Sequence, residues 1–329
     1  MITNEREEIL WKLRNLSADT FSDTAAAVFR YQSRHNPVYA RFLALLNRPH
    51  TGPNDFPFLP IQVFKYHLVQ TGAWQPAGYF LSSGTTGHTP SRHAVRDTGF
   101  YLQNAIRGFT RLYGDPANWC TLALLPAYLE REGSSLVLMA DAFIRRSRYP
   151  DSGFFLHDHN RLASVLQRCL DNGVPTLLLG VSFALLDFAE AHPMALPGLV
   201  IMETGGMKGR RQEMTREALH GVLKDAFQTT QIHSEYGMTE LFSQAYSKGG
   251  GVFTPAETMR VSARDVYDPF SAVQPGKTGV LNIIDLANLD TCSFIGTEDL
   301  GRVYADGRFE VLGRLDAAEV RGCNLMVEW

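Results

Sequence analysis

The sequence predicts an α/β protein with a mainly parallel sheet, and the alternation of two kinds of segment carries this prediction. From Gly78 onward, short apolar runs alternate with helix-period stretches such as 156–171 and 210–228. Such alternation is typical of βαβ units, whose parallel strands are buried on both faces. The apolar runs are TLALLPAYL, SSLVLMADAFI, PTLLLGVSFALLDFAEA, LVIMETGG, QIHSEYGMTE, GVLNIIDLANL and RVYADGRFEVLGR. We therefore expect strands in these runs and helices between them.

The two ends of the chain have a different pattern. Residues 4–47 place apolar side chains at helix spacing and contain few β-branched residues, which predicts two or three helices. Residues 279–313 contain shorter strand-like runs with a turn signal at Asp306-Gly307, which predicts a hairpin or a small barrel. We expect a helical N-terminal portion (1–75), an α/β core (76–312) and a short hinge and tail (313–329).

Composition and charge exclude several classes of protein. The chain has 329 residues and a formal net charge of −3, so it offers no basic field for a nucleic acid partner. Its four cysteines are isolated, which argues against a disulfide scaffold or a zinc site. The most apolar stretch, 174–191, is too short and too interrupted to span a bilayer. We expect a cytoplasmic protein with no membrane span and with reduced thiols.

A glycine- and hydroxyl-rich loop is the first candidate site. Tyr79–Pro90 reads YFLSSGTTGHTP, and its centre offers several backbone and hydroxyl donors that a phosphate chain needs. The alternative is a Ser/Thr-rich surface loop, and the segment has no Walker lysine. The candidate phosphate-binding residues are Ser82, Ser83, Gly84, Thr85, Thr86 and Gly87.

Three later segments supply complementary chemistry. In HSEYGMTE, Tyr236 offers a flat face to a purine and Glu240 a carboxylate to Mg²⁺. In TEDLG, Asp299 is a candidate acceptor for two ribose hydroxyls, and in LGRLD, Arg314 adds a cation. Each segment alone has an ordinary structural explanation, whereas the ordered set indicates a nucleotide site.

The four segments resemble the patterns SGTTGxP, YGxTE, TGDLG and GRxD of the adenylate-forming superfamily. Longer stretches, among them LLPAYLEREGSSLV, METGGMKGRR, IHSEYGMTELFSQAYS and EVRGCNL, look like the acyl-protein synthetase (LuxE-type) family. The resemblance extends from about residue 60 to the C-terminus. It implies the α/β N-terminal core of an adenylate-forming enzyme, with mainly parallel sheets and a small β region near the C-terminus.

The resemblance also implies an activity and its partners. It implies a ligase that uses ATP and Mg²⁺ to activate a carboxylic, and specifically a fatty, acid and then loads the acyl group onto a protein thiol. An acyl-accepting reductase or a carrier protein is the implied partner. The residues that it assigns to the nucleotide are the loop residues above together with Gly205, Gly206, Tyr236, Gly237, Met238, Thr239, Asp299 and Arg314, and it assigns the metal to Glu240.

The chain departs from the superfamily in three ways. The lysine that usually follows the phosphate loop is replaced by Ser-Arg-His, so Arg92 is a candidate for its charge. Glu298 stands where the superfamily has glycine. The sequence ends 13 residues after Asp316, so we expect the mobile C-terminal domain and its lysine to be absent, as in acyl-protein synthetases.

Three further residues have competing explanations. Cys323 follows Arg321-Gly322, and the resemblance makes it the acyl carrier, whereas an inert thiol is the alternative. Lys208 opens a predicted helix and belongs either to a solvated face or beside the α-phosphate. His233 is a candidate contact for the acyl carboxylate, or a strand-end histidine with a structural partner.

The acid itself is not specified by any motif. We expect its pocket in 124–139 and 177–190, where Leu, Phe and Val favour an apolar acid. Three functions stay open: a ligase that loads its own Cys323, a ligase whose acceptor is coenzyme A or a phosphopantetheine, and a nucleotide-binding subunit without turnover.

Overall fold

A computed structural model describes residues 2–48, 55–82, 90–126, 133–205, 211 and 214–315. The helices are α1 (Ile2–Arg14), α2 (Phe21–His35), α3 (Pro37–Leu46), α4 (Val63–Tyr66), α5 (Thr98–Tyr113), α6 (Ser135–Arg146), α7 (His159–Asp171), α8 (Ser182–Ala191) and α9 (Arg216–Phe227). The strands are β1 (Leu59–Pro60), β2 (Gly78–Leu81), β3 (Arg92–Val95), β4 (Cys120–Leu124), β5 (Gly153–Phe154), β6 (Thr176–Val181), β7 (Val200–Thr204), β8 (His233–Tyr236), β9 (Ala245–Ser247), β10 (Val252–Pro255), β11 (Met259–Arg264), β12 (Thr278–Asp285), β13 (Phe294–Val303) and β14 (Phe309–Arg314).

One large mixed sheet organises the chain, in the order β11-β12-β13-β14-β10-β9-β8-β7-β6-β4-β5, with β1 paired to β13. Strands β4 to β8 pair parallel with one another, and β1 pairs parallel with β13. Strand β9 pairs antiparallel with β8, and β9 to β14 pair antiparallel with one another. A separate hairpin pairs β2 with β3. The predicted α/β class and the β region near its C-terminal part are confirmed. The large sheet is mixed rather than mainly parallel, because the half formed by β9 to β14 pairs antiparallel.

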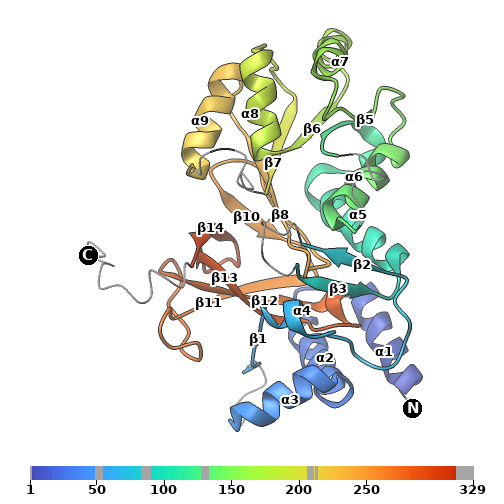
Figure 1. Cartoon of the computed structure of the whole chain (residues 1–329), viewed down its shortest axis with the longest axis vertical. Helices are drawn as coiled ribbons and strands as arrows, with labels where there is room; N and C mark the ends of the chain where they lie inside the picture. Colours follow the sequence, from blue (N-terminus) through green and yellow to red (C-terminus); the bar gives the residue numbers. More distant parts are fainter. Residues whose placement is uncertain are drawn as a thin grey trace.

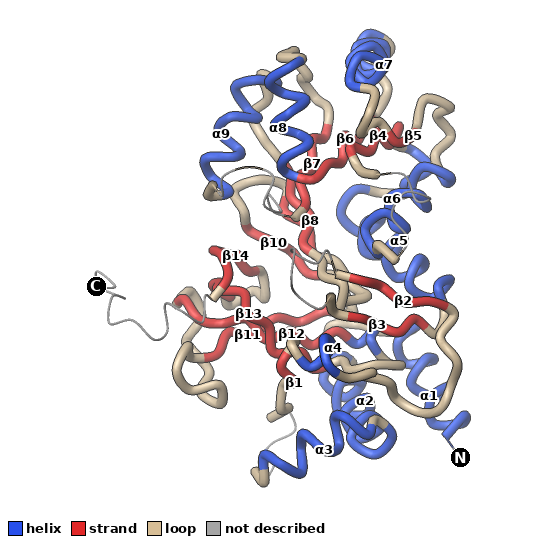
Figure 2. Tube along the Cα trace, in the orientation of Figure 1, coloured by secondary structure: helices blue, strands red, loops and turns tan. Residues whose placement is uncertain are grey.

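Helices cover the two parts of the sheet separately (Figure 1). Helices α5 to α9 accompany the parallel strands in the upper half of the view, and α1 to α4 lie with the antiparallel strands below. Two large apolar clusters match this division, one built around β4, β6 and β7, and one around α1 to α3, β12 and β13. Figure 2 shows β8, β10 and β14 between the two halves.

Local capping explains where several helices begin. The predicted helices over 156–171 and 210–228 are confirmed as α7 and α9, which begin later in the sequence, at His159 and Arg216. Asp158 accepts a hydrogen bond from the amide of Arg161, and Thr215 accepts one from the amide of Ala218. Such side chains satisfy amides that the first helical turn leaves unpaired. The three helices of the N-terminal part are confirmed as α1, α2 and α3.

Two apolar runs were assigned, wholly or in part, to the wrong element. The second half of PTLLLGVSFALLDFAEA is the helix α8, which begins at Ser182 directly after β6. SSLVLMADAFI is the helix α6, although its apolar density suggested a strand. Ser134 caps it by accepting from the amide of Val137, and Val137, Ala140 and Phe143 share its buried face at helical spacing. The turn at Asp306-Gly307 connects β13 to β14 as predicted, with Gly307 at a φ of 82°. These strands form a hairpin within the large sheet rather than a separate barrel.

Candidate active site

A cavity of about 900 Å³ lies between the two apolar clusters. Its walls come from the carboxyl ends of β7 and β8, the β2–β3 hairpin, the first turns of α6 and α9, and the strands β13 and β14. In α/β sheets the carboxyl ends of parallel strands are where ligands bind, because loops and helix N-termini gather there. This cavity is therefore the candidate active site.

Two residues from different halves of the sheet meet in its wall. The Tyr236 phenol donates a 2.8 Å hydrogen bond to Oδ2 of Asp299. Nε of Arg314 lies 3.5 Å from Oδ1 of the same carboxylate, because β13 and β14 pair Asp299 opposite Arg314. Burial raises the pKa of Asp299, although Tyr236 and Arg314 oppose this shift. Burial, and then the charge of Asp299, raise the pKa of Tyr236 well above its ordinary value.

The Glu240 carboxylate lies in the same wall and is 6% exposed. Burial raises its pKa, and the opposing contributions are a hydrogen bond with the Ser91 side chain and the charges of Arg314 and Lys65. A buried carboxylate facing a polar cavity is costly unless a cation or donors complete its surroundings. Lys65, from α4, also lines the cavity.

Side-chain hydrogen bonds fix the backbone at Glu240. Nδ2 of Asn288 donates to the Glu240 carbonyl at 2.8 Å. The buried imidazole of His93 joins the Thr239 carbonyl, 2.9 Å from Nδ1, to the Thr291 hydroxyl, 2.8 Å from Nε2. Burial lowers the pKa of His93 to about 4, so the ring is neutral at pH 7 and one nitrogen donates while the other accepts.

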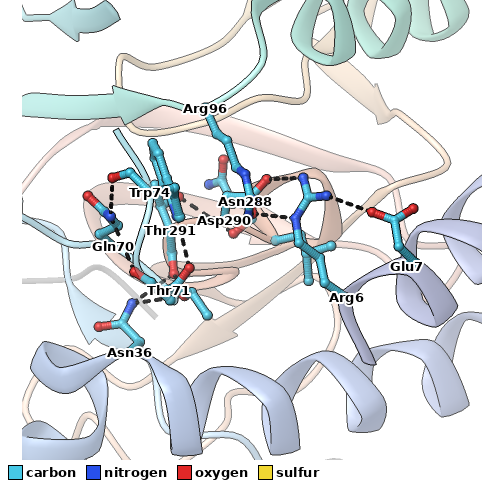
Figure 3. A network of polar contacts seen from close by, with 12 residues as sticks. Arg6, Glu7, Asn36, Gln70, Thr71, Trp74, Arg96, Asn288, Asp290 and Thr291 are labelled. Carbon is cyan, nitrogen blue, oxygen red and sulfur yellow. Dashed lines mark hydrogen bonds and ion pairs between the residues drawn. The ribbon is translucent and has the colours of Figure 1, made fainter. Parts of the chain in front are cut away.

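The loop that contains Asn288 and Thr291 is itself anchored to the N-terminal helices (Figure 3). Asp290 pairs with Arg6 of α1 at 2.7 Å and with Arg96 at 2.9 Å. Asn36, between α2 and α3, donates to the Thr291 carbonyl at 2.8 Å. The helical N-terminal part thus supports the segment that holds the Glu240 backbone in place.

Gly237 is required by close packing in the cavity wall. A Cβ at this position would lie 2.6 Å from Oε1 of Glu235 and 3.7 Å from Cγ of Gln244. The first distance is shorter than any van der Waals contact, so a side chain at residue 237 would displace the Glu235 carboxyl. Thr204 donates to the other Glu235 oxygen. All four residues line the cavity.

A second acidic group ties α9 to the sheet. Glu203 accepts from Nε of Arg216 at 3.2 Å and lies 3.4 Å from Nε2 of His220. Burial opposes ionisation of Glu203, but its partners, His220 first, bring its pKa below the ordinary value. Arg216 also donates to the Val311 carbonyl at 2.7 Å, and so connects β7 with β14 across the cavity.

No family model and no curated protein matches the sequence. Solved structures do match. ATP-bound MatB from Rhodopseudomonas palustris has a TM-score of 0.52 and 15% identity, over 72% of this chain and 47% of MatB. A 2-hydroxyisobutyryl-CoA ligase in complex with 2-HIB-AMP and CoA has a TM-score of 0.64 and 14% identity, over 91% of this chain and 68% of the ligase. This is the fold of the adenylate-forming enzymes.

A third match is McyG A-PCP complexed with phenylalanyl-adenylate, with a TM-score of 0.51 and 17% identity, over 74% of this chain and 48% of that one. The chain spans about half the length of MatB. At these identities the likeness concerns the adenylate-forming fold and not the substrate. It agrees with the predicted N-terminal core of such an enzyme.

The adenylate-forming fold brings most of the described candidate residues together. Those that line the cavity are Ser82, Gly205, Tyr236, Gly237, Met238, Thr239, Glu240, Asp299 and Arg314. Ser82 lies at the end of β2, where its Oγ accepts from the Ser91 amide at 2.8 Å. Eight other candidates lie outside the described residues: Ser83, Gly84, Thr85, Thr86, Gly87, Gly206, Lys208 and Cys323.

Two candidates are placed elsewhere. Among the described residues, neither His233 nor Arg92 lines the cavity. His233 starts β8, and its Nδ1 lies 3.0 Å from the Tyr113 hydroxyl, which fits the strand-end alternative. Burial lowers the pKa of His233 to about 4. The Arg92 guanidinium lies 5.6 Å from the centre of the Tyr79 ring.

Four cavity or support residues were not among the candidates. Lys65 and Arg216 supply cations to the cavity, Glu235 supplies a carboxyl, and His93 supports the backbone. Glu235 was visible as an acidic residue beside the tyrosine motif. Lys65 and Arg216 carry no such signal, because only the tertiary fold turns their helices toward the cavity.

The expected acid pocket is only partly confirmed. From 124–139 and 177–190, the described residues that line the cavity are Ser134, Ser135, Leu136, Met139 and Ser182. The lining that these ranges supply is therefore mixed in the part of the chain described, with Leu136 and Met139 apolar and three serines polar. The Leu and Phe side chains of β6 and α8 pack into the upper core, because β6 is buried on both faces.

Two absences are established for the described residues. No helix among them is both long and apolar enough to cross a membrane. In the same part of the chain, no group of three or more His, Cys, Asp or Glu side chains is arranged as a metal site.

Proposed function

We propose that this protein uses ATP to activate a carboxylic acid as an acyl-adenylate and then passes the acyl group to a thiol. The observation that carries the proposal is the meeting of Tyr236, Asp299 and Glu240 in one cavity at the carboxyl ends of the parallel strands. They belong to separate motifs, and the fold that unites them is that of adenylate-forming enzymes.

The cavity has groups suited to each part of ATP. The Asp299 carboxylate has two partners and retains lone pairs that can accept from ribose hydroxyls. Tyr236 and the backbone of Gly205 lie in the wall where a purine would pack. Ser82 marks the start of the Ser82–Gly87 loop, which we assign to the phosphates on its sequence alone.

Glu240 is suited to Mg²⁺. It is a buried carboxylate at the cavity wall whose pKa burial raises, and a divalent cation would relieve the cost of its charge. Because the described residues hold no three-ligand cluster, the ion would need phosphate oxygens as well as Glu240. When bound, the metal would neutralise charge on the phosphates.

The reaction has two balanced steps. In the first, a carboxylate oxygen of the acid bonds to the α-phosphorus as the bond to pyrophosphate breaks. In the second, a thiolate bonds to the acyl carbon and AMP leaves with the electron pair of the broken C–O bond. The protein contributes positioning and electrostatic stabilisation. Lys65 and Arg314 are the described cavity cations whose charges lower the pKa of Glu240, so they are suited to this role.

The acceptor that we propose is the protein's own Cys323, with an acyl-accepting reductase or a carrier protein downstream. The support is the sequence resemblance to acyl-protein synthetases and the neighbouring Arg321, which would favour the thiolate. Under the same resemblance the acid is a fatty acid. A free thiol such as that of coenzyme A is the second candidate acceptor, since a neighbour of the same fold was solved with CoA.

Intact-mass measurement separates these outcomes. The protein is incubated with ATP, Mg²⁺ and a panel of acids, with and without coenzyme A. A covalent acyl increment that hydroxylamine removes supports self-loading. AMP release that depends on added coenzyme A supports the free acceptor, and an unchanged mass without AMP release contradicts ligase activity.

A further inference from the structure

Strand β14 is one residue longer than β13 where the two strands pair. The opposed residues are Asp299 with Arg314, Leu300 with Gly313, and Gly301 with Val311. Two steps along β14 thus match one step along β13, and Leu312 is the extra residue. This arrangement is a β-bulge, and Gly313 within it has a φ of 153°, a conformation that residues with a side chain rarely adopt. We call residues 311–313 the β14 bulge.

The β14 bulge decides which residue faces Asp299. Opposed residues of an antiparallel pair have their side chains on the same face of the sheet. Without the extra residue, pairing continued from Gly301 and Val311 would place Gly313 opposite Asp299. With the bulge, Arg314 is opposite, and its Nε lies 3.5 Å from Oδ1 of Asp299. The bulge therefore gives this carboxylate its cation, and bulges next to active sites commonly re-aim a side chain in this way.

Arg216, the first residue of α9, reaches the bulge from the parallel half of the sheet. Its Nη1 donates to the Val311 carbonyl at 2.7 Å, and its Nε donates to Glu203 at 3.2 Å. Its guanidinium carbon lies 5.0 Å from the centre of the Phe253 ring, and Phe253 pairs with Phe309 of β14. A bulge disrupts the regular ladder of backbone hydrogen bonds, so a side-chain donor at this carbonyl stabilises it.

The ion pair with Glu203 explains why residue 216 is a cation, but it does not explain the second bond. Glu203 belongs to β7, is 4% exposed and also lies 3.4 Å from Nε2 of His220, so it is a fixed anchor. An arginine has five N–H donors in a planar fork and can bind the carboxylate and the carbonyl at once. A lysine would keep the ion pair but has no such fork, so it would lose the contact with the bulge.

We propose that Arg216 is a positioning residue for the nucleotide: it holds the β14 bulge, and the bulge places Arg314 opposite Asp299. This inference rests on the proposed function, because it concerns the same nucleotide site. Arg216 acts through the strand and not by touching the nucleotide. Its effect is therefore confined to the group that Asp299 binds, which we assign as the ribose hydroxyls.

The test uses two nucleotides that differ only in the ribose hydroxyls. The Kd values of ATP and of 2′,3′-dideoxy-ATP are measured by isothermal titration for the wild type and for Arg216→Lys. We expect the Kd of ATP to rise about tenfold and that of the dideoxy nucleotide by less than about threefold, because only ATP can use Asp299. A general structural defect would weaken both alike. Equal weakening of the two nucleotides, or weakening of neither, overturns the inference and leaves the proposed function intact.

Arg302→Lys is the matched control. Arg302 also connects β13 with β14, since it lies opposite Glu310 with its Nη1 3.7 Å from Oε2, but it is outside the bulge and is not part of the cavity wall. This variant should bind both nucleotides as the wild type does. The same ribose-selective loss in Arg302→Lys would overturn the assignment to the bulge.

A double-mutant cycle shows whether Arg216 acts through Arg314. In an Arg314→Met background the bulge no longer places a cation beside Asp299, so adding Arg216→Lys should change the Kd of ATP by less than about twofold. A full tenfold effect in that background would overturn the inference.

A second variant covers the case in which Arg216→Lys does not fold, which urea unfolding would show. Gly313→Ala strains the same bulge through its φ, while the added Cβ would meet no atom within 4 Å. It should cause the same ribose-selective loss, and equal binding of both nucleotides by Gly313→Ala and the wild type would overturn the inference. Wild-type protein that binds neither nucleotide would contradict the proposed function and this inference together.

Discussion

The Tyr236 hydroxyl donates a 2.8 Å hydrogen bond to Asp299 across the boundary between the parallel and antiparallel parts of the sheet. Tyr236 ends β8, and its ring packs against Phe253 and Phe309 of the lower core. Asp299 lies in β13 and is held from its other side by Arg314. The bond therefore joins two motifs that are 63 residues apart and fixes both at one cavity.

Asp299→Asn should weaken ATP binding without unfolding the protein. The asparagine oxygen still accepts from Tyr236, but the amide nitrogen cannot accept from a ribose hydroxyl. Hydrogen bonds to a charged group contribute about 1.5–3 kcal/mol, so the Kd for ATP should rise between about 10-fold and 150-fold. Isothermal titration checks this. The control is Asp306→Asn, at an exposed aspartate that pairs with Arg308, and equal affinity in both variants would remove Asp299 from the site.

Glu240→Gln should abolish metal-dependent adenylation while keeping or raising stability. The substitution removes a buried charge whose pKa burial raises, so unfolding at pH 7 should require at least as much urea. The rate of pyrophosphate release should fall at least 100-fold at saturating Mg²⁺. Glu298→Gln changes another cavity carboxylate and serves as the control. An unaltered rate in Glu240→Gln would exclude Glu240 as a metal ligand.

His93 should make the protein acid-sensitive. Burial lowers its pKa to about 4, against a reference of about 6.5 when unfolded. The unfolded state therefore binds this proton more tightly, and stability is lost as pH falls from 6.5 toward 4. The contribution between pH 7 and pH 5 is about 2 kcal/mol. Urea unfolding at both pH values should show this loss in the wild type.

His93→Gln is the comparison for this prediction. The variant should lack that part of the pH dependence, whatever its stability at pH 7. The same slope in the variant and the wild type would show that His93 does not titrate as the structure implies.

Adenylation and thioester formation should separate at Cys323, which lies outside the described residues. Cys323→Ser should still make acyl-adenylate, because the residues assigned to ATP lie elsewhere, but it should lose the thioester that hydroxylamine cleaves. Mass spectrometry of the protein after incubation with ATP and acid measures this. The matched variant is Cys292→Ser, at a buried cysteine of the lower core. A hydroxylamine-labile acyl group on Cys323→Ser would exclude Cys323 as the acyl carrier.

The sequence predicted elements and motifs whose signals are local. The parallel strands appeared as continuous apolar runs. Tyr236, Asp299 and Glu240 were identified because their motifs occur in a specific order. The helix α6 was not predicted, because its apolar density resembles that of a buried strand. In so short a run, periodicity cannot distinguish a buried helix from a buried strand.

The character of the cavity wall was not predictable from the sequence. Leu178 and Ser182 are close in sequence, yet Leu178 packs into the core and Ser182 faces the cavity. Which face of β6 or α8 meets the cavity depends on packing by distant segments. The role of His93 depends likewise on Thr291, which is 198 residues away.

Acid-dependent exchange of labelled pyrophosphate into ATP tests the central claim most directly, because it requires reversible formation of an acyl-adenylate and no thiol. The wild-type protein is assayed with Mg²⁺ and the panel of acids, and Glu240→Gln and Asp299→Asn are assayed under the same conditions. The account predicts exchange that depends on one class of acid and on Mg²⁺, and that falls strongly in both variants. Wild-type protein that binds ATP but exchanges pyrophosphate with none of the acids, or exchange that both variants retain, would contradict it.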